Sequence, residues 1–289
     1  MTLFPPAVRR TIGICSAVLI FILLAGATYQ GVATALERRE FPRPGGMVNV
    51  GDHQLHIYCT GTGSPTVILE APAAGLSAAW AQVQPKVASV TRVCSYDRAG
   101  LGWSEAGDRT FDGGRVSDEL RTLLARADER GPFVVAGQGL GAAFARIFAA
   151  RPDNAVAAVV LIDPPRADAA ARSGEADWIV PMSPWLARAG VLRAGRMLSS
   201  KADGLENGRG ALGAFLNRPD HLTQAAKELV AWNDVARRAA EAPIPAHPTI
   251  VTVDFGSPDR IAFLTDATAV DRVVRAIAEA VAATRTTTN

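Results

Sequence analysis

A glycine-spaced turn between two apolar stretches restricts the fold of this chain more than any other segment. Phe133–Ala136 is an apolar run of strand length, and it is followed by Gly137-Gln138-Gly139-Leu140-Gly141 and then a helix-like stretch to Ala150. A Gly-x-Ser-x-Gly elbow has this layout, in which a strained strand-to-helix turn lifts a serine hydroxyl above a sheet. Here Gly139 occupies the serine position. The segment therefore predicts a strand, a sharp turn and a helix, with no nucleophile on the turn.

The N-terminal part of the chain contains an apolar stretch from Thr11 to Leu36 without a charged residue. A spanning helix needs about 20 predominantly apolar residues, so we expect a short tail over 1–10 and a single transmembrane anchor over 11–36. A cleaved signal peptide is the alternative, because Ala25-Gly26-Ala27 resembles an A-x-A cleavage site. Arginines flank both ends of the stretch, so the positive-inside count does not fix its orientation.

The remainder of the chain, after a charged linker over 37–46 that contains proline and glycine, predicts one α/β domain over 47–289. Short apolar runs alternate with helical patterns, which is typical of a mostly parallel sheet covered by helices on both faces. The clearest helical pattern is the last, where Val270, Val273, Val274, Ile277 and Val281 share one face. The runs that predict strands are 47–50, 54–59, 66–69, 92–96, 133–136, 158–162 and 249–253.

Composition excludes several classes of function. The net charge of the chain is +2 and no Lys/Arg cluster is present, so we expect no nucleic-acid partner. The three cysteines form no CxxC or Cys/His spacing, so we expect no structural metal site and no cofactor. The three glycines of the turn are not followed by Lys-Ser/Thr, which argues against a phosphate loop.

One stretch breaks the alternation of strands and helices. Residues 165–245 contain amphipathic pieces with several tryptophans but no convincing strand. This length is far greater than a single crossover helix requires. It predicts a helical cap inserted between two strands of the sheet.

Four segments after the linker have a characteristic order and spacing: Gly51-Asp52-His53-Gln54-Leu55-His56-Ile57-Tyr58-Cys59-Thr60-Gly61, Val67-Ile68-Leu69-Glu70-Ala71, Val160-Leu161-Ile162-Asp163-Pro164 and the most specific string, Tyr96-Asp97-Arg98-Ala99-Gly100-Leu101-Gly102-Trp103-Ser104. Together they resemble the membrane-anchored bacterial α/β-hydrolase family. The resemblance covers most of the chain after the linker. It implies an α/β-hydrolase fold with an eight-stranded sheet, a cap after the sixth strand, and esterase-like or lipase-like activity in intact members.

The catalytic positions that the resemblance implies are altered in this sequence. Gly139 replaces the nucleophile, and the segment 259–268 before the last helix, where the catalytic histidine is expected, contains no histidine. Asp254 is a possible relic of the acid, but an acid without a histidine to orient has no role in a triad. Pro72 in the loop after the third strand has no N–H to offer an oxyanion, although Ala73 and Leu140 retain theirs.

Other residues offer only partial substitutes. We expect Pro72, Ala73, Gln138, Gly139, Leu140 and His221 to line any ligand pocket. His53 and His56 are expected to be strand or turn residues that face solvent or their neighbours, and His247 to lie at the opposite edge of the sheet. Ser77 has the position of a helix N-cap, and Asp97 with Arg98 is expected to form an ion pair that orders its loop.

The implied fold also places the strands of Cys59 and Cys94 side by side. Two interpretations follow, a disulfide or two small buried thiols. A disulfide would place the globular domain outside the cytoplasm, on the periplasmic side.

These losses predict a membrane-anchored protein that binds rather than catalyses, either as a binding module or as an accessory subunit of a membrane complex. Gly13 and Ala17 form a small-xxx-small pair that allows the anchor to pack against another membrane helix. One alternative is an active hydrolase of esters that uses a non-standard constellation of residues. Another is a diverged relative with little remaining function.

Overall fold

A single seven-stranded sheet organises the part of the chain that the structure describes. The computed structural model describes residues 5–107, 111–165, 179–203, 208–243, 249–255 and 266–288. The strands lie in the order β1-β2-β4-β3-β5-β6-β7, and β2 pairs antiparallel with both β1 and β4, while all other pairs are parallel. The mostly parallel sheet predicted from the sequence is confirmed. The strands are β1 (Gly46–Asn49), β2 (Gln54–Thr60), β3 (Thr66–Glu70), β4 (Val93–Tyr96), β5 (Phe133–Gln138), β6 (Val156–Ile162) and β7 (Thr249–Val253).

The eighth strand that the resemblance implies would lie between β7 and the last helix. That interval includes residues 256–265, which lie outside the described residues.

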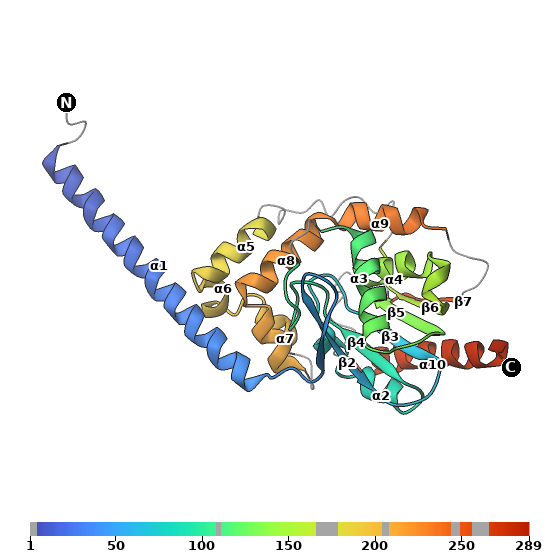
Figure 1. Ribbon diagram of the computed structural model, residues 1–289. Helices are drawn as coiled ribbons and strands as arrows, with labels where there is room; N and C mark the ends of the chain where they lie inside the picture. The colour runs from blue at the N-terminus through green and yellow to red at the C-terminus, as the bar shows by residue number, and fades with distance from the viewer. Residues whose placement is uncertain are drawn as a thin grey trace.

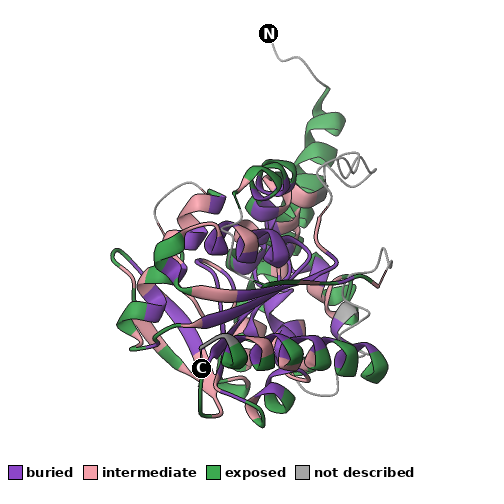
Figure 2. Cartoon of the chain, turned by 90° about the vertical axis from the view of Figure 1, so that its right-hand side faces the viewer, coloured by how far each residue is buried: buried purple, intermediate pink, exposed green. Residues whose placement is uncertain are grey.

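Helices cover both faces of the sheet (Figures 1 and 2). One apolar cluster lies between the sheet and α10, and includes Trp80, Val134, Val160 and Ile277. The cluster on the other face joins the sheet to α3 and α4 through residues such as Leu120 and Phe148. The core is therefore built on both faces of the buried central strands, as a parallel sheet requires. The covering elements are α2 (Gln84–Ala88), α3 (Gly113–Arg126), α4 (Leu140–Ala149) and α10 (Ala267–Thr288), with the 3-10 turns η1 (Ser77–Trp80) and η2 (Pro152–Asn154).

The insertion between β6 and β7 is helical throughout the residues described there, as predicted. Its tryptophans do not all point inward: Trp232 is buried, Trp185 is exposed, and Trp178 lies outside the described residues. Its elements are α5 (Ile179–Arg188), α6 (Val191–Ala194), η3 (Ser199–Ala202), α7 (Arg209–Phe215), α8 (Pro219–Val230) and α9 (Trp232–Glu241). We refer to this set, α5 to α9, as the cap.

The N-terminal helix α1 (Pro6–Glu40) is long and apolar enough to cross a membrane, and its most apolar window is exposed. It projects from the globular part, while its C-terminal half runs past the cap (Figure 1). The helix continues to Glu40, so the first four residues of the predicted linker over 37–46 are helical. Glu37, in this charged end of α1, forms an ion pair with Arg193 of α6.

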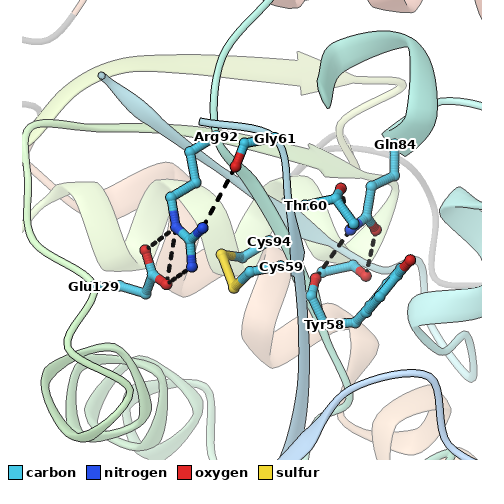
Figure 3. The surroundings of a disulfide bond; sticks show 9 residues. Tyr58, Cys59, Thr60, Gly61, Gln84, Arg92, Cys94 and Glu129 are labelled. Carbon is cyan, nitrogen blue, oxygen red and sulfur yellow. Dashed lines mark hydrogen bonds and ion pairs between the residues drawn. A yellow bond between two sulfur atoms is a disulfide. The ribbon is translucent and has the colours of Figure 1, made fainter. Parts of the chain in front are cut away.

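Strands β2 and β4 are joined by a disulfide between Cys59 and Cys94 (Figure 3). The two cysteines face each other directly in the antiparallel register. Beside them, Arg92 forms an ion pair with Glu129. Although Glu129 lies close to both sulfurs, sulfurs that are bonded to each other are not thiolates, so this group lacks the ligand chemistry of a cysteine metal site.

Candidate functional site

The turn between β5 and α4 has the backbone of an elbow. Gly139 has φ +55° and ψ −121°, a region that residues with a side chain rarely adopt. Its N–H donates to the carbonyl of Ile162 on β6 at 2.9 Å. Gly139 itself is buried. The strand, turn and helix predicted from the glycine spacing are therefore present, and the tip of the turn offers no functional group.

The flanking glycines are required by close packing. A Cβ on Gly137 would lie 2.3 Å from the carbonyl oxygen of Gly141. A Cβ on Gly141 would lie 2.4 Å from the carbonyl oxygen of Ala71, in the loop after β3. The elbow and that loop thus touch backbone to backbone, as they would have to if they were to form one site.

The loop after β3 is held by Arg98 rather than left open to a ligand. The Arg98 guanidinium donates to the carbonyl oxygens of Ala71 at 2.7 Å and Pro72 at 2.8 Å. The N–H of Ala74 donates to the carboxylate of Glu228 on the cap at 3.0 Å. Ala73 packs against the cluster around Leu140. Of the predicted pocket residues, Pro72, Ala73, Gly139 and Leu140 therefore do come together at one place.

Arg98 is the centre of a buried ionic cluster. A guanidinium has five N–H donors, and all five are used here. Two donate to the carbonyls of Ala71 and Pro72, one donates to Glu70 at 2.7 Å, and two donate to Glu228 at 2.7 and 2.9 Å. Burial alone would lower the pKa of Arg98, but Glu228 and Glu70 raise it. Burial raises the pKa of Glu70, against the opposing effects of Arg98 and of a hydrogen bond from Tyr96. A charge that is paired and fully hydrogen-bonded in this way is one that a protein interior tolerates.

Helix α8 of the cap supplies the groups that close the site. His221, Gln224 and Glu228 lie at i, i+3 and i+7, so they share one face of the helix. Gln224 packs on Gly100, where an added Cβ would lie 3.1 Å from the Gln224 Cβ. Together these three side chains, which we call the α8 polar face, reach the loop after β3 and the glycine-rich turn after β4.

His221 bridges the two loops. Its Nδ1 accepts from the N–H of Gly102 at 3.1 Å, and its Nε2 lies 3.0 Å from the carbonyl oxygen of Ala74. An amide N–H only donates and a carbonyl only accepts, so the ring is neutral with its proton on Nε2. Burial lowers the pKa of His221, although the Ala74 carbonyl and nearby carboxylates oppose that effect. A ring engaged at both nitrogens is occupied structurally and is not placed as a general base.

A second buried cluster contains serine, histidine and aspartate side chains. His56 and Asp97 are both fully buried, with His56 Nδ1 at 3.0 Å from the Asp97 carboxylate. The Ser77 hydroxyl lies 3.5 Å from the same nitrogen, and the Ser77 N–H donates to Asp97 at 2.6 Å. A Ser-His-Asp triad needs the acid on one ring nitrogen and the hydroxyl on the other. This geometry is therefore different from a triad.

These contacts correct two expectations and decide between the two alternatives of a third. Asp97 does not pair with Arg98: Asp97 receives His56 and the N–H groups of Ser77 and Trp103, whereas Arg98 turns toward Glu70 and Glu228. Ser77 begins η1 as its first residue, not as a cap. His56, like His53, is buried among its neighbours, which is one of the two placements expected for it, because β2 lies within the sheet and the turn after β4 covers it.

The remaining predicted residues lie apart or outside the described part. Asp254 is exposed just after β7, and its carbonyl accepts from Arg272 at 3.1 Å. His247 is outside the described residues. Gln138 ends β5 and is fully buried. A surface hollow of about 870 Å³ is lined by residues such as His53, Arg115 and Arg238 on the β1–β2 turn, α3 and α9, and its lining does not include the elbow.

Sequence reasoning missed the residues that dominate this site, namely Glu70, Glu228 and the role of Arg98 between them. Glu70 carried a signal, because it is a carboxylate directly attached to the apolar run Thr66–Leu69. Glu228 carried a weaker one, since it shares a helical face with His221. Neither signal identifies Arg98 as the partner, 130 residues away from Glu228.

Solved structures share this architecture. A putative epoxide hydrolase variant from Pseudomonas aeruginosa superposes with a TM-score of 0.65 at 17% identity, covering 83% of this chain and 96% of that one. An enol-lactonase from Burkholderia xenovorans gives a TM-score of 0.59 at 16% identity, covering 81% of this chain and 99% of the other. At such identities the likeness establishes the fold alone.

Sequence comparison gives partial relatives and a family. An uncharacterised protein of Schizosaccharomyces pombe is 34% identical over 113 residues, which are 38% of this chain and 21% of that protein. An uncharacterised vacuolar membrane protein of Saccharomyces cerevisiae is 33% identical over 89 residues, which are 30% of this chain and 14% of that protein. The matches therefore span about a fifth or less of these two relatives. The model of the Alpha/beta hydrolase family matches residues 60–288.

Proposed function

Because this chain belongs to the alpha/beta hydrolase family, we propose that it keeps the family's fold while having lost the family's catalysis, and that it acts as a membrane-anchored binding protein. It is a binding module or an accessory subunit of a membrane complex. The position that would carry the nucleophile is Gly139, and no histidine occurs anywhere in 248–289.

One observation carries this proposal: Glu228, a side chain of the cap, takes up an N–H of the loop after β3, which packs against the elbow. Glu228 takes the N–H of Ala74 in the loop that would face an oxyanion. It also satisfies Arg98, whose remaining donors hold the carbonyls of that same loop. An oxyanion hole requires donors that point at the developing charge. In this loop the Ala74 N–H is already bonded to Glu228, and the carbonyls of Ala71 and Pro72 are bonded to Arg98.

Helix α1 and the disulfide support a location in the membrane, with the globular domain on the side away from the cytoplasm. Helix α1 has the length and apolarity of a single membrane span, and the yeast relative carries the description of a vacuolar membrane protein. The Cys59–Cys94 disulfide favours an oxidising compartment for the globular domain, which is the side of the membrane away from the cytoplasm. A retained anchor rather than a cleaved signal peptide is part of the proposal.

Purification from native membranes tests the binding role. We expect the full chain, solubilised in mild detergent, to co-purify with a partner in fixed stoichiometry. A Gly13→Leu, Ala17→Leu double variant should lose a partner that packs on the small-residue face of α1. A chain that elutes alone under every mild detergent condition, with no saturable partner in cross-linking, would contradict the accessory-subunit role.

A hydrolase with a non-standard constellation is the second candidate, and the Ser77–His56–Asp97 cluster is the observation that favours it. The test is labelling of the full chain with a fluorophosphonate probe, followed by peptide mapping. We expect no labelled serine, because Ser77 is buried and Asp97 already occupies the His56 nitrogen that faces it. Stoichiometric labelling of Ser77 that is lost in His56→Ala would establish the second candidate instead.

A further inference from the structure

Helices α5 and α6 and the turn after α6 present apolar side chains that the described residues leave uncovered. The Trp185 side chain is 66% exposed, and Met182, Val191 and Met197 are also exposed. Exposed apolar surface is unfavourable in water, by about 25 cal/mol per Å². Large exposed apolar side chains that are neighbours therefore mark a contact surface.

This surface is fixed to α1 by a close backbone contact. A Cβ on Gly26 would lie 2.1 Å from the carbonyl oxygen of Ala189, at the end of α5. Gly190 has φ +74°, and a Cβ there would lie 2.9 Å from the carbonyl oxygen of Gly26. Glycine on both sides is what allows two backbones to approach this closely. The turn between α5 and α6 is thus held against Gly26 of α1.

A polar contact lies one turn further along α1. Gln30 is buried, donates to the Asn217 carbonyl at 2.8 Å and accepts from Arg193 at 2.9 Å. Arg193 also forms the ion pair with Glu37. From Gln30 onward, therefore, α1 is matched to polar side chains of the cap, whereas at Gly26 its contact with the cap is close packing of backbone on backbone.

The length of the uncharged stretch sets where the membrane must end. Arg10 is the last charged residue before the stretch, and a hydrocarbon core of about 30 Å takes about 20 helical residues. A span that begins at Thr11 consequently ends near Gln30, so Gly26 lies about 6 Å inside that boundary at 1.5 Å per residue. The α5–α6 turn, which touches Gly26, then lies at the outer edge of the hydrocarbon layer, about 6 Å inside that boundary.

We propose that Met182, Trp185, Val191 and Met197 form a membrane-seated surface, which enters the interfacial layer, between headgroups and outer acyl chains, of the same bilayer that α1 spans. The side chains suit that place. Tryptophan is enriched at membrane–water interfaces, and the Arg188 guanidinium lies 5.1 Å from the Trp185 ring, where it can meet lipid phosphates. We take lipid as the partner of this surface, because a bilayer that α1 spans surrounds the helix at the height of Gly26, where the α5–α6 turn touches it. The inference rests on the retained anchor but not on the loss of catalysis.

The test measures whether lipid reaches Trp185. The full chain is reconstituted into phosphatidylcholine/phosphatidylglycerol vesicles, with or without phosphatidylcholine brominated on the acyl chains near the glycerol end. Tryptophan fluorescence is compared for the natural chain, Trp185→Phe, and Val230→Trp in the Trp185→Phe background. Val230 is the matched control, because it is 71% exposed but lies at the far end of α8. Intact mass establishes whether α1 is retained.

We expect bromolipid to quench the natural chain, this quenched component to be lost in Trp185→Phe, and Val230→Trp not to restore it. Unquenched Trp185 in a chain that retains α1 would overturn the proposal, and so would quenching that is the same at position 230. Trp185 that is shielded in native membranes but unquenched in the pure vesicles would indicate a protein partner instead. Removal of α1 in the mature protein would overturn the inference. The proposed loss of catalysis would not be affected, because ester turnover tests it separately.

Discussion

Single glycines at the elbow are explained by two different physical requirements. Gly137 and Gly141 are required by contact, because an added methyl would overlap backbone oxygen. Gly139 is accommodated by conformation, since its positive φ is free for glycine and strained for other residues. The elbow is therefore relaxed at the position where a catalytic elbow stores strain.

Gly141→Ala should destabilise the protein by about 1–3 kcal/mol, because its Cβ would enter the space of the Ala71 carbonyl. Gly46→Ala is the control, since an added Cβ there meets nothing within 4 Å. Thermal unfolding in detergent measures both. Equal midpoints for the two variants would mean that the elbow and the loop after β3 are not packed as described.

Gly139→Ser should lower stability by roughly 1–3 kcal/mol, the usual cost of a strained backbone at a non-glycine residue. It should also yield no ester hydrolysis, because His221 is engaged at both ring nitrogens. Thermal unfolding and p-nitrophenyl ester turnover measure the two effects. Turnover gained by this one substitution would show that a base still reaches the elbow.

At the scale of elements, α8 is the part of the cap that closes the site. Its polar face contacts the loop after β3 and the turn after β4, and the specific Tyr-Asp-Arg-Ala-Gly string proves to serve these contacts. Asp97 and Arg98 each satisfy a separate buried group, and Gly100 and Gly102 let α8 and Asp97 approach. The string is thus a structural junction between sheet and cap.

Glu228→Ala should destabilise the protein by about 3–5 kcal/mol, because it leaves the buried Arg98 charge with part of its partners missing. Glu241→Ala is the matched control. Glu241 pairs with Arg237 at 3.9 Å on the exposed side of α9, so the effect should stay within about 1 kcal/mol. The midpoints of thermal unfolding of the two variants measure these effects. A small effect of Glu228→Ala would mean that the Arg98–Glu228 ion pair does not hold the cap on the sheet.

His221 should make stability fall on acidification. Its pKa is lowered in the folded state, so below the unfolded value near 6.5 the unfolded chain binds a proton that the folded chain does not. Stability is then lost as pH falls from about 6.5 toward the folded pKa, at most about 1.4 kcal/mol per pH unit for one proton. His221→Gln should remove this slope relative to the natural chain in unfolding measured from pH 8 to 5. Parallel pH profiles for the two chains would contradict the assignment.

The sequence predicted the elements better than the contacts between them. Apolar runs identified all seven strands, and the glycine spacing identified the elbow, because both depend on local periodicity and backbone conformation. The Arg98 cluster was not predictable, since Glu70, Arg98 and Glu228 come together only through the fold. The Asp97–Arg98 prediction failed for the same reason: adjacency along the chain says little about where two neighbouring side chains point.

At the scale of the whole molecule, the same cap is joined to two partners. Through α8 it is bound to the elbow side of the hydrolase-like domain, and through Gly190, Arg193 and Asn217 it is bound to α1. The cap therefore links α1 to the elbow side of the domain, and it is held at both ends. A substrate-admitting lid has to move, whereas this arrangement favours a fixed scaffold.

Ester turnover by the full, unmodified chain in detergent is the most direct test of the central claim. The account predicts rates on p-nitrophenyl esters of short and medium chain length that equal those of a heat-denatured sample. Saturable turnover above that background, abolished by Ser77→Ala or by a substitution at His56, would contradict it.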